Sequence, residues 1–290
     1  MGATEGSPDD AGDAVLITGC SSGIGAAAAA DLVRHGHTVY ATARKPETLQ
    51  ELAEAGCRTL ALDVTDEASM SAAVAAVEAE HGAVGALVNN AGYSQSGAVE
   101  SVSLDDIRRQ FETNVFGLVR MSQLVLPGMR KAGRGRIVNI GSMGGKLTFP
   151  GGGIYHATKY AVEAISDAMR FEVQGFGVQV ILIEPGLITT EFASAATSSM
   201  SGLDDGGPYG HFNNAVADTM DSIYRGPVAK VLGGDPDDVA ATIRKAVTAD
   251  KPRPRYTVTA SAKLAITQRR ITPDRVWDLA MRTQFSVPRP

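Results

Sequence analysis

The sequence lacks the features that mark secreted, membrane-spanning or nucleic-acid-binding proteins. Its 290 residues include only two cysteines, Cys20 and Cys57, so no disulfide framework is expected. No cluster of His and Cys accompanies them, so we expect no metal site. No apolar run approaches the roughly 20 residues that span a membrane. The net charge of −5 offers no basic surface to nucleic acid.

The first twelve residues, Met1 to Gly12, are polar and acidic and contain no apolar stretch of the signal-peptide kind. We therefore expect a flexible N-terminal segment over residues 1–12 and a cytoplasmic location. The rest of the chain has an ordinary globular composition, with 44% hydrophobic and 20% charged residues. A chain of this length can bury most of its apolar surface in one core.

Apolar, strand-like segments alternate with helical patterns along the chain. The predicted strands are Ala14–Thr18, Thr38–Thr42, Thr59–Leu62, Ala86–Asn89, Arg136–Ile140, Gln179–Glu184 and Tyr256–Thr259. The predicted helices are Ile24–Arg34, Pro46–Ala55, Glu67–Glu80, Leu104–Lys131, Tyr155–Gln174 and Asp237–Ala249. The strands are almost wholly apolar, as expected when both sheet faces are covered. This alternation predicts an α/β Rossmann fold of one domain, with a doubly wound, seven-stranded parallel sheet and helices on both faces.

A glycine-rich loop separates the first strand from the first helix. It reads Thr18-Gly19-Cys20-Ser21-Ser22-Gly23-Ile24-Gly25 and leads into an alanine-rich helix. Glycines permit a sharp turn and a close approach of phosphate to the backbone. Free amides and the helix dipole then favour the anion. The strand–loop–helix context predicts a pyrophosphate site formed by Gly19, Ser21, Ser22, Gly23, Ile24 and Gly25.

Tyr155 and Lys159 lie at the start of a later helix, four residues apart, and therefore share one helical face. A free tyrosine has a pKa near ~10, and a nearby ammonium lowers that value. Tyr155 can then give a proton to a carbonyl oxygen or take one from an alcohol. His156, the next residue after Tyr155, is expected to face elsewhere on the helix. The loop and the pair together predict a nucleotide-dependent hydride-transfer enzyme.

These motifs together resemble the short-chain dehydrogenase/reductase family. Asn89-Asn90-Ala91-Gly92 matches its motif after the fourth strand, and Pro185-Gly186 with Thr190 matches its motif after the sixth. The residues that fall where its catalytic tetrad falls are Asn114, Ser142, Tyr155 and Lys159.

The resemblance implies a role for each member of this tetrad beside Tyr155. Ser142 would hydrogen-bond the substrate oxygen, Lys159 would bind the nicotinamide ribose, and Asn114 would hold a water on the proton path. The resemblance covers Ala14 to Phe192, the predicted helix Asp237–Ala249 and the predicted strand Tyr256–Thr259. We expect a dinucleotide-binding and catalytic domain over residues 13–260 and a C-terminal extension over 261–290 without family motifs, in which Trp277 packs the tail.

The residues after the second strand indicate which dinucleotide binds. NAD-binding folds place an acid there, whereas this chain has Ala43-Arg44-Lys45. A guanidinium binds a 2′-phosphate, so Arg44 and Ser22 predict a preference for NADP(H), with NAD(H) also possible. The alternative is that Arg44 is a solvated loop charge.

Asp63 matches the family position that accepts from the adenine amine, and its alternative role is to cap the helix near Asp66. The other cofactor contacts that the resemblance implies are Val64, Asn90, Ala91, Gly92, Tyr155, Lys159, Pro185, Gly186, Ile188 and Thr190.

The predicted substrate walls are mostly apolar. They come from Ser94–Gly97, Met143–Ile154, Leu187–Phe192 and a substrate lid over residues 189–212, whose alternative is a disordered loop. We expect an uncharged, apolar ketone, aldehyde or alcohol as substrate, and a resemblance to the hydroxysteroid- and retinol-dehydrogenase branch suggests a bulky one. Alternatives are a carrier-bound 3-oxoacyl reductase, a sugar-nucleotide epimerase and a non-catalytic dinucleotide sensor.

Two long predicted helices carry apolar residues on more than one face. One face of Leu104–Lys131 and of Tyr155–Gln174 must cover the sheet, and the other would need a partner. The apolar residues that suggest this second face are Val115, Leu118, Val119, Val162, Ile165 and Met169. In the resembling family the corresponding helices pair across a two-fold axis. We expect a homodimer or homotetramer.

Overall fold

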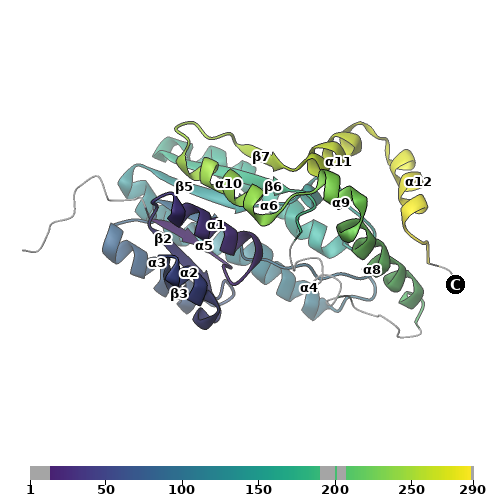
Figure 1. Ribbon diagram of the computed structural model, residues 1–290, viewed down its shortest axis with the longest axis horizontal. Coiled ribbons are helices and arrows are strands. Elements are labelled where there is room, and N and C mark those ends of the chain that lie inside the picture. Colours follow the sequence, from purple (N-terminus) through teal and green to yellow (C-terminus); the bar gives the residue numbers. More distant parts are fainter. Residues whose placement is uncertain (1–13, 190–199, 201–206, 289–290) are drawn as a thin grey trace, which may run out of the picture.

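A computed structural model describes residues 14–189, 200 and 207–288 and contains a seven-stranded parallel sheet (Figure 1). The strand order is β3-β2-β1-β4-β5-β6-β7, so the order of the chain reverses between β1 and β4. The strands are β1 (Val15–Ile17), β2 (Val39–Ala43), β3 (Arg58–Ala61), β4 (Ala86–Asn89), β5 (Gly135–Ile140), β6 (Val178–Pro185) and β7 (Arg255–Val258). The predicted doubly wound fold is confirmed, and each predicted strand end lies within one residue of the observed end.

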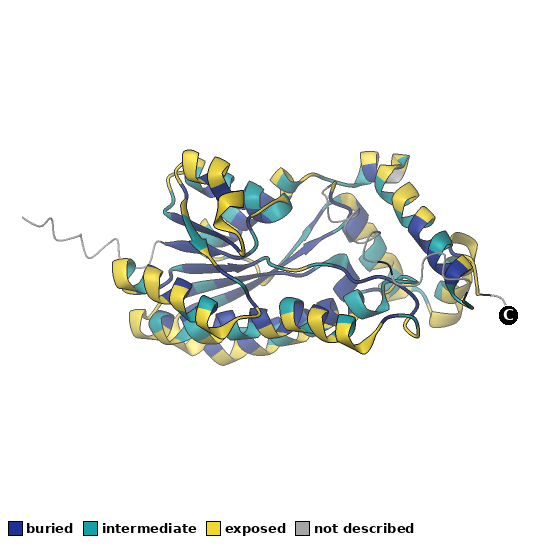
Figure 2. Cartoon of the chain, turned by 90° about the horizontal axis from the view of Figure 1, so that it is seen from below, coloured by how far each residue is buried: buried dark blue, intermediate teal, exposed yellow. Residues whose placement is uncertain are grey.

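Helices cover both faces of this sheet, and the buried strands lie between their exposed outer surfaces (Figure 2). The apolar residues of α1 and α10 pack on one face, and those of α3, α5 and α6 pack on the other. The described α-helices are α1 (Gly23–Arg34), α2 (Gln50–Glu54), α3 (Glu67–His81), α4 (Leu104–Phe111), α5 (Gly117–Ala132), α6 (Gly153–Val173), α8 (Gly210–Arg225), α9 (Pro227–Leu232), α10 (Pro236–Thr248), α11 (Ala260–Ile271) and α12 (Asp274–Gln284). None of the helices in the described part of the chain is long and apolar enough to cross a membrane.

Three predicted helices differ from the structure. The helix predicted over Leu104–Lys131 is interrupted by a π-helical turn, Glu112–Phe116, between α4 and α5. The helix predicted over Pro46–Ala55 is a 3₁₀ turn, Pro46–Leu49, followed by the short α2. The helix predicted to begin at Tyr155 begins two residues earlier, at Gly153. Each difference lies in local winding or at a helix end, which a hydrophobic pattern defines poorly.

Four helices were not predicted at all: α8, α9, α11 and α12. Figure 1 shows α8, α11 and α12 gathered at one end of the molecule, beyond the sheet. Helix α8 begins at Gly210, so the last residues of the predicted lid, Gly210 to Phe212, are helical. Most of that predicted lid, and Thr190 with it, lies outside the described residues.

Candidate active site

A cavity of about 1440 Å³ lies at the carboxyl ends of the strands, where open α/β sheets bind ligands. One part is lined by the glycine loop and by the ends of β2, β4 and β6, and the other by α8, α11 and α12. The residues predicted as site contacts that line it are Gly19, Ser21, Ser22, Gly23, Ile24, Arg44, Asp63, Val64, Asn90, Ala91, Gly92, Ser142, Tyr155, Lys159, Pro185, Gly186 and Ile188. Two described members of the predicted set, Gly25 and Asn114, do not line it.

The glycine loop is held against the segment that follows β4. A Cβ on Gly19 would stand 2.9 Å from the Cα of Ala91, and Gly19 has a φ of 73°, which favours glycine. A Cβ on Gly25 would stand 2.5 Å from Nδ2 of Asn90. Gly25 therefore serves the close packing of the loop and not the cavity wall.

Hydrogen bonds from Asn90 hold the backbone of this loop in place. Its Nδ2 donates to the carbonyl oxygens of Thr18 and Gly19, both at 2.9 Å, and the hydroxyl of Thr18 accepts from the Asn90 amide at 3.0 Å. The first turn of α1 has Ser22 at its N-cap without a side-chain capping bond. Its amides are thus left for another acceptor, as a pyrophosphate site requires.

Arg44 and Asp63, which follow β2 and β3, are the groups predicted to hold the adenosine half of the dinucleotide. Arg44 is exposed, lines the cavity and forms no ion pair with any described residue. Asp63 accepts at Oδ1 from the amide and the hydroxyl of Thr65, at 2.9 and 2.8 Å. The N-cap of α3 is Asp66, so capping this helix is not the role of Asp63. The residues present fit an NAD(P) molecule: a glycine cradle that a Cβ would fill, an uncapped helix and an unpaired cation.

Tyr155, Ser142 and Lys159 line the cavity between its two parts. Ser142 follows β5 and accepts at Oγ from the Gly144 amide at 3.0 Å. Lys159 is buried, its Nζ donates to the Ile140 carbonyl oxygen at 2.8 Å, and Nζ lies 5.8 Å from the centroid of the Tyr155 ring. The structure thus brings together the phenol, the hydroxyl and the ammonium that the sequence predicted.

The pKa of Tyr155 differs from the prediction. Burial raises the pKa of its phenol, and a hydrogen bond with Ser142 offsets only part of this rise. Burial also lowers the pKa of Lys159 to about 8. The prediction that Lys159 lowers the pKa of Tyr155 is therefore wrong for this structure, because desolvation of the phenol dominates and the ammonium is bound to Ile140.

Asn114 lies in the π-helical turn, of which Glu112 and Thr113 line the cavity while Asn114 does not. Its Oδ1 accepts from the Tyr93 amide at 3.0 Å, and its Nδ2 donates to the Tyr93 carbonyl at 2.8 Å and to Thr158 Oγ1 at 3.1 Å. Thr158 immediately precedes Lys159 on α6. Asn114 thus links the segment after β4 to the catalytic face of α6, and π turns often occur at functional sites.

His156 lines the same cavity, contrary to the prediction that it faces elsewhere. The ring is buried, its Nδ1 lies 3.0 Å from the Gly144 carbonyl oxygen, and it packs edge-on to Phe149 at 5.9 Å. Burial lowers the pKa of His156, which favours its neutral form.

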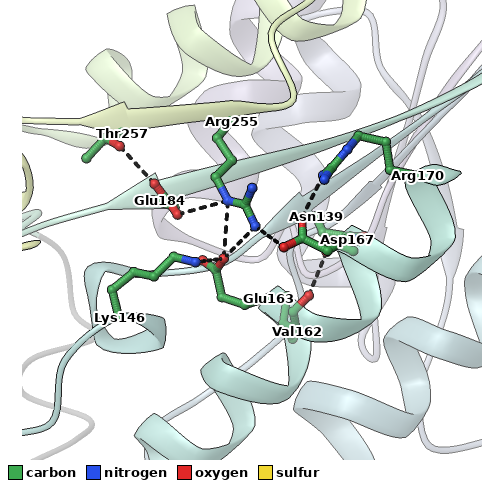
Figure 3. Close-up of polar contacts among 10 residues, drawn as sticks. Asn139, Lys146, Val162, Glu163, Asp167, Arg170, Glu184, Arg255 and Thr257 are labelled. Carbon is green, nitrogen blue, oxygen red and sulfur yellow. Dashed lines mark hydrogen bonds and ion pairs between the residues drawn. The ribbon is translucent and has the colours of Figure 1, made fainter. Parts of the chain in front are cut away.

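A cluster of charged side chains gathers around the buried Glu163 of α6 (Figure 3). Oε2 of Glu163 accepts from Nζ of Lys146 at 2.5 Å and from Arg255 at 3.1 Å. Arg255 also contacts Asp167 at 2.5 Å and lies 3.5 Å from Glu184. The side chains of Glu163 and Glu184 are 6% and 4% exposed, so these carboxylates depend on the two cations for their charge balance.

The cluster joins the three segments that carry the site. Lys146 follows the turn begun by Ser142, Glu163 lies one helical turn after Lys159, and Glu184 immediately precedes Pro185. Sequence reasoning did not find it, although the four-residue spacing of Lys159 and Glu163 was a usable signal. We conclude that this cluster holds the three segments in register.

The titration of Glu163 should be visible in the stability of the protein. Burial and the neighbouring Glu184 raise its pKa from 4.5 to about 7, against the opposing effect of Lys146. The folded state therefore binds more protons than the unfolded state between these values, so this group stabilises the fold at low pH and loses that effect as pH rises through about 7.

We expect Glu163→Gln to flatten the dependence of Tm on pH between 5 and 7, because glutamine imitates the protonated carboxyl. The measurement is calorimetry over this pH range. Glu172→Gln, on an exposed residue of the same helix, is the control and should leave the wild-type slope. An unchanged slope in Glu163→Gln would show that Glu163 is ionised throughout.

The other part of the cavity is formed by side chains without charge. Phe149 lies 6.4 Å from both Trp277 and Phe285 between ring centroids. The lining residues from α8, α11 and α12 are Val216, Met220, Ile223, Tyr224, Ser261, Leu264, Ala265, Gln268, Val276, Trp277, Ala280, Met281 and Gln284. Trp277 was expected only to pack the tail, but it lines the cavity as well. The C-terminal extension thus forms one wall of the site.

The predicted substrate walls are only partly those observed. Ser94, Gln95, Ser96, Met143, Phe149 and Leu187 line the cavity. Leu147 is fully buried in the core, and Ile154 does not line the cavity. Phe192 lies outside the described residues. The sequence could not place the wall from α8, because this helix carries no motif.

Comparison with known proteins agrees with this geometry. Residues 13–201, more than half of the chain, match the family model described as short chain dehydrogenase. The chain is 44% identical to 3-ketodihydrosphingosine reductase of Bacteroides thetaiotaomicron over 179 residues, which are 61% of this chain and 65% of that protein. It is 35% identical to NADPH-dependent 3-dehydrocapnine reductase of Ornithobacterium rhinotracheale, over 91% of this chain and 94% of that protein.

A solved structure, the closed form of serine dehydrogenase complexed with NADP+, superimposes with a TM-score of 0.72. It is 33% identical, and the match covers 85% of this chain and 94% of that one. The solved structures that this chain resembles include complexes with NADP and a complex with NAD, so the likeness shows a dinucleotide fold without choosing between them.

Proposed function

Because the chain belongs to the short-chain dehydrogenase/reductase family and is therefore an oxidoreductase of CH–OH groups, we propose that it interconverts a bulky apolar ketone and its alcohol with NADP(H). One observation carries this proposal. The cavity joins a dinucleotide cradle to an uncharged apolar chamber, and Tyr155, Ser142 and Lys159 lie where the two meet.

The chain's own residues provide binding and proton transfer. A bound nicotinamide cofactor supplies the hydride for the carbonyl carbon. Tyr155 gives its proton to the carbonyl oxygen, which the raised pKa of its phenol permits, because the neutral acid is present at neutral pH. Ser142 holds the same oxygen, and its hydrogen bond to Tyr155 keeps the phenol in place. Lys159, largely protonated below its pKa of about 8, binds the ribose and returns a proton to Tyr155.

Asn114 acts in this scheme as a positioning residue. Its side-chain amide is already engaged with Tyr93 and Thr158, which fixes the start of the Lys159 turn. The water that we predicted beside Asn114 remains part of the proposal, and it would connect Lys159 with solvent. The cofactor preference for NADP(H) rests on Arg44, and it agrees with the NADPH dependence of the 3-dehydrocapnine reductase.

The substrate class rests on the chamber around Trp277. A long apolar chain can occupy this part without burying a charge, since no described residue of α8, α11 or α12 that lines it is charged. Two relatives are named as reductases of 3-ketodihydrosphingosine and of 3-dehydrocapnine, and a 3-keto compound with an apolar chain fits the same space.

We expect NADPH oxidation to become more efficient as the chain of a ketone lengthens. Each added methylene that enters the chamber should raise kcat/KM about fourfold, from ~0.8 kcal/mol per buried CH₂. Trp277→Ala should reduce this gain for long ketones more than for short ones. The matched control is Leu279→Ala, on an exposed residue of the same helix that does not line the cavity. A kcat/KM independent of chain length would contradict the substrate class.

We also propose that the chain forms a homodimer or homotetramer, in which partly exposed Val119 and Ile165 of the predicted set remain available for contact. Val115, Leu118, Val162 and Met169 are buried within the monomer. Exposed apolar side chains on the same helical segments are Phe116 (53%), Tyr160 (44%) and Phe171 (77%). Tyr160 and Phe171 lie eleven residues apart on α6 and hence on one helical face.

Light scattering at micromolar concentration should give a mass above that of one 30.2 kDa chain. We expect Phe171→Lys to lower this mass, because it places a charge on the shared face. Val231→Lys, at a residue of α9 with equal exposure, should leave the assembly intact. A monomeric wild type would reject this proposal.

A further inference from the structure

Helices α11 and α12 form a basic and apolar surface unlike the rest of the protein. Residues 260–290 contain six Lys or Arg and two Asp, a net charge of +4, whereas residues 1–259 carry −9. Helix α12 contains no buried residue. The exposed large apolar side chains of this region are Leu264, Ile271, Val276, Leu279 and Val287. Core formation does not account for so many apolar groups left in water within one short segment.

Basic and apolar residues share the same helical faces. On α11, the basic residues Lys263 and Arg270 lie seven residues apart, and so do their apolar neighbours Leu264 and Ile271. This spacing, close to two helical turns, aligns the two basic residues with each other and the two apolar residues with each other along the helix. On α12, Arg275 and Arg282 have the same spacing. These four cations are exposed and form no ion pair with any residue the structure describes. They differ in this from Arg269, which pairs with Asp274 and lies over the Trp277 ring.

The same helices form the edge of the apolar chamber. Leu264 and Val276 are 50% and 54% exposed, and both also line the cavity. They therefore lie at its mouth, while Trp277 and Met281 line its interior from α12. In Figure 1 these helices lie at the end of the molecule where the chain terminates. The basic, apolar surface is thus continuous with an exposed edge of the chamber.

We propose that α11 and α12 dock on an anionic lipid surface, so that the mouth of the chamber faces the lipid. Amphipathic helices that combine Lys and Arg with Trp, Leu and other apolar residues lie in the plane of such a surface. Each exposed basic residue near it strengthens binding about fivefold. The acidic remainder of the chain is repelled, which orients the protein with this surface toward the lipid.

The positive charge of the α11 and α12 surface argues against a second copy of the chain as the partner that covers it. A two-fold dimer would bring two identical surfaces together, each with a net charge of +3 over the residues of α11 and α12. An anionic lipid surface complements this charge, and it also receives the exposed apolar side chains. The consequence for catalysis, that an apolar substrate enters directly from lipid, rests on the proposed function, whereas the docking itself does not.

Vesicle co-sedimentation of the full chain tests the docking without any turnover. We expect the protein to bind vesicles of phosphatidylcholine mixed with phosphatidylglycerol, to bind pure phosphatidylcholine far more weakly, and to dissociate as salt is added. Arg270→Glu combined with Arg275→Glu should weaken binding to the anionic vesicles at least about twentyfold. Lys131→Glu combined with Arg134→Glu makes the same charge change at the amino-terminal edge of the sheet and should have no effect.

Ile271→Gln combined with Leu279→Gln tests the apolar contribution and should weaken binding without changing the charge. Far-UV circular dichroism and NADPH titration check that each variant is folded. The proposal is overturned if the wild type does not co-sediment with anionic vesicles. It is also overturned if Arg270→Glu with Arg275→Glu binds them as tightly as the wild type does. A fall in mass of this variant by light scattering, with no vesicle binding by the wild type, would assign the surface to a second copy instead. Failure of ketone reduction would leave the docking result intact, and the reverse also holds.

Discussion

Replacement of Tyr155 by phenylalanine should lower kcat by about 10²–10⁴-fold while leaving the affinity for NADPH within a few-fold of the wild type. The change removes the transferable proton but keeps the ring that lines the cavity beside Ser142. Steady-state kinetics with a long-chain ketone gives kcat, and fluorescence titration gives the Kd for NADPH.

Tyr224→Phe is the matched control for this variant. Tyr224 also lines the cavity, from α8, and burial raises its pKa to about 12. It acts electrostatically on Tyr155 but is not one of the residues predicted to transfer the proton, so its loss should reduce kcat by less than tenfold. If Tyr155→Phe retained activity within a few-fold of wild type, Tyr155 could not be the proton donor.

The double change Ala43→Asp with Arg44→Ala should turn the cofactor preference from NADPH toward NADH. It removes the exposed cation that lines the cavity directly after β2 and puts a carboxylate in reach of the 2′ position. Loss of charge-assisted hydrogen bonds together with a new like-charge repulsion should shift the ratio of the two kcat/KM values by roughly 100-fold or more.

Lys45→Ala provides the control for charge alone, since Lys45 is an exposed neighbour of Arg44 that does not line the cavity. It should leave the preference unchanged. A wild-type protein that binds NADH as tightly as NADPH would show that Arg44 is a solvated loop charge.

The parts of this site that could be predicted from the sequence are those fixed by local geometry. The glycine loop needs its strand, turn and helix in immediate succession, and the positive φ of Gly19 and Gly23 follows from residue type. Tyr155 and Lys159 share a face because they are four residues apart. Regular alternation of strands and helices similarly predicted a doubly wound parallel sheet, but the order of its strands comes only from the structure.

The parts that could not be predicted depend on tertiary packing. The rise in the pKa of Tyr155 results from burial, which no spacing reveals. The cluster around Glu163 forms only when α6, β6 and β7 are assembled. Trp277 and Met281 carry no motif, and they line the cavity only because the tertiary fold places α12 against it.

The central claim is that this cavity reduces an apolar ketone by direct transfer from NADPH, with Tyr155 as the acid. The most direct measurement uses NADPH deuterated at the transferred position of the nicotinamide, a long-chain 3-keto substrate, and mass spectrometry of the product. The account predicts an alcohol that carries the deuterium on its carbinol carbon, formed by the wild type and hardly at all by Tyr155→Phe. An alcohol without deuterium, or no alcohol from any apolar ketone despite tight binding of NADPH, would contradict it.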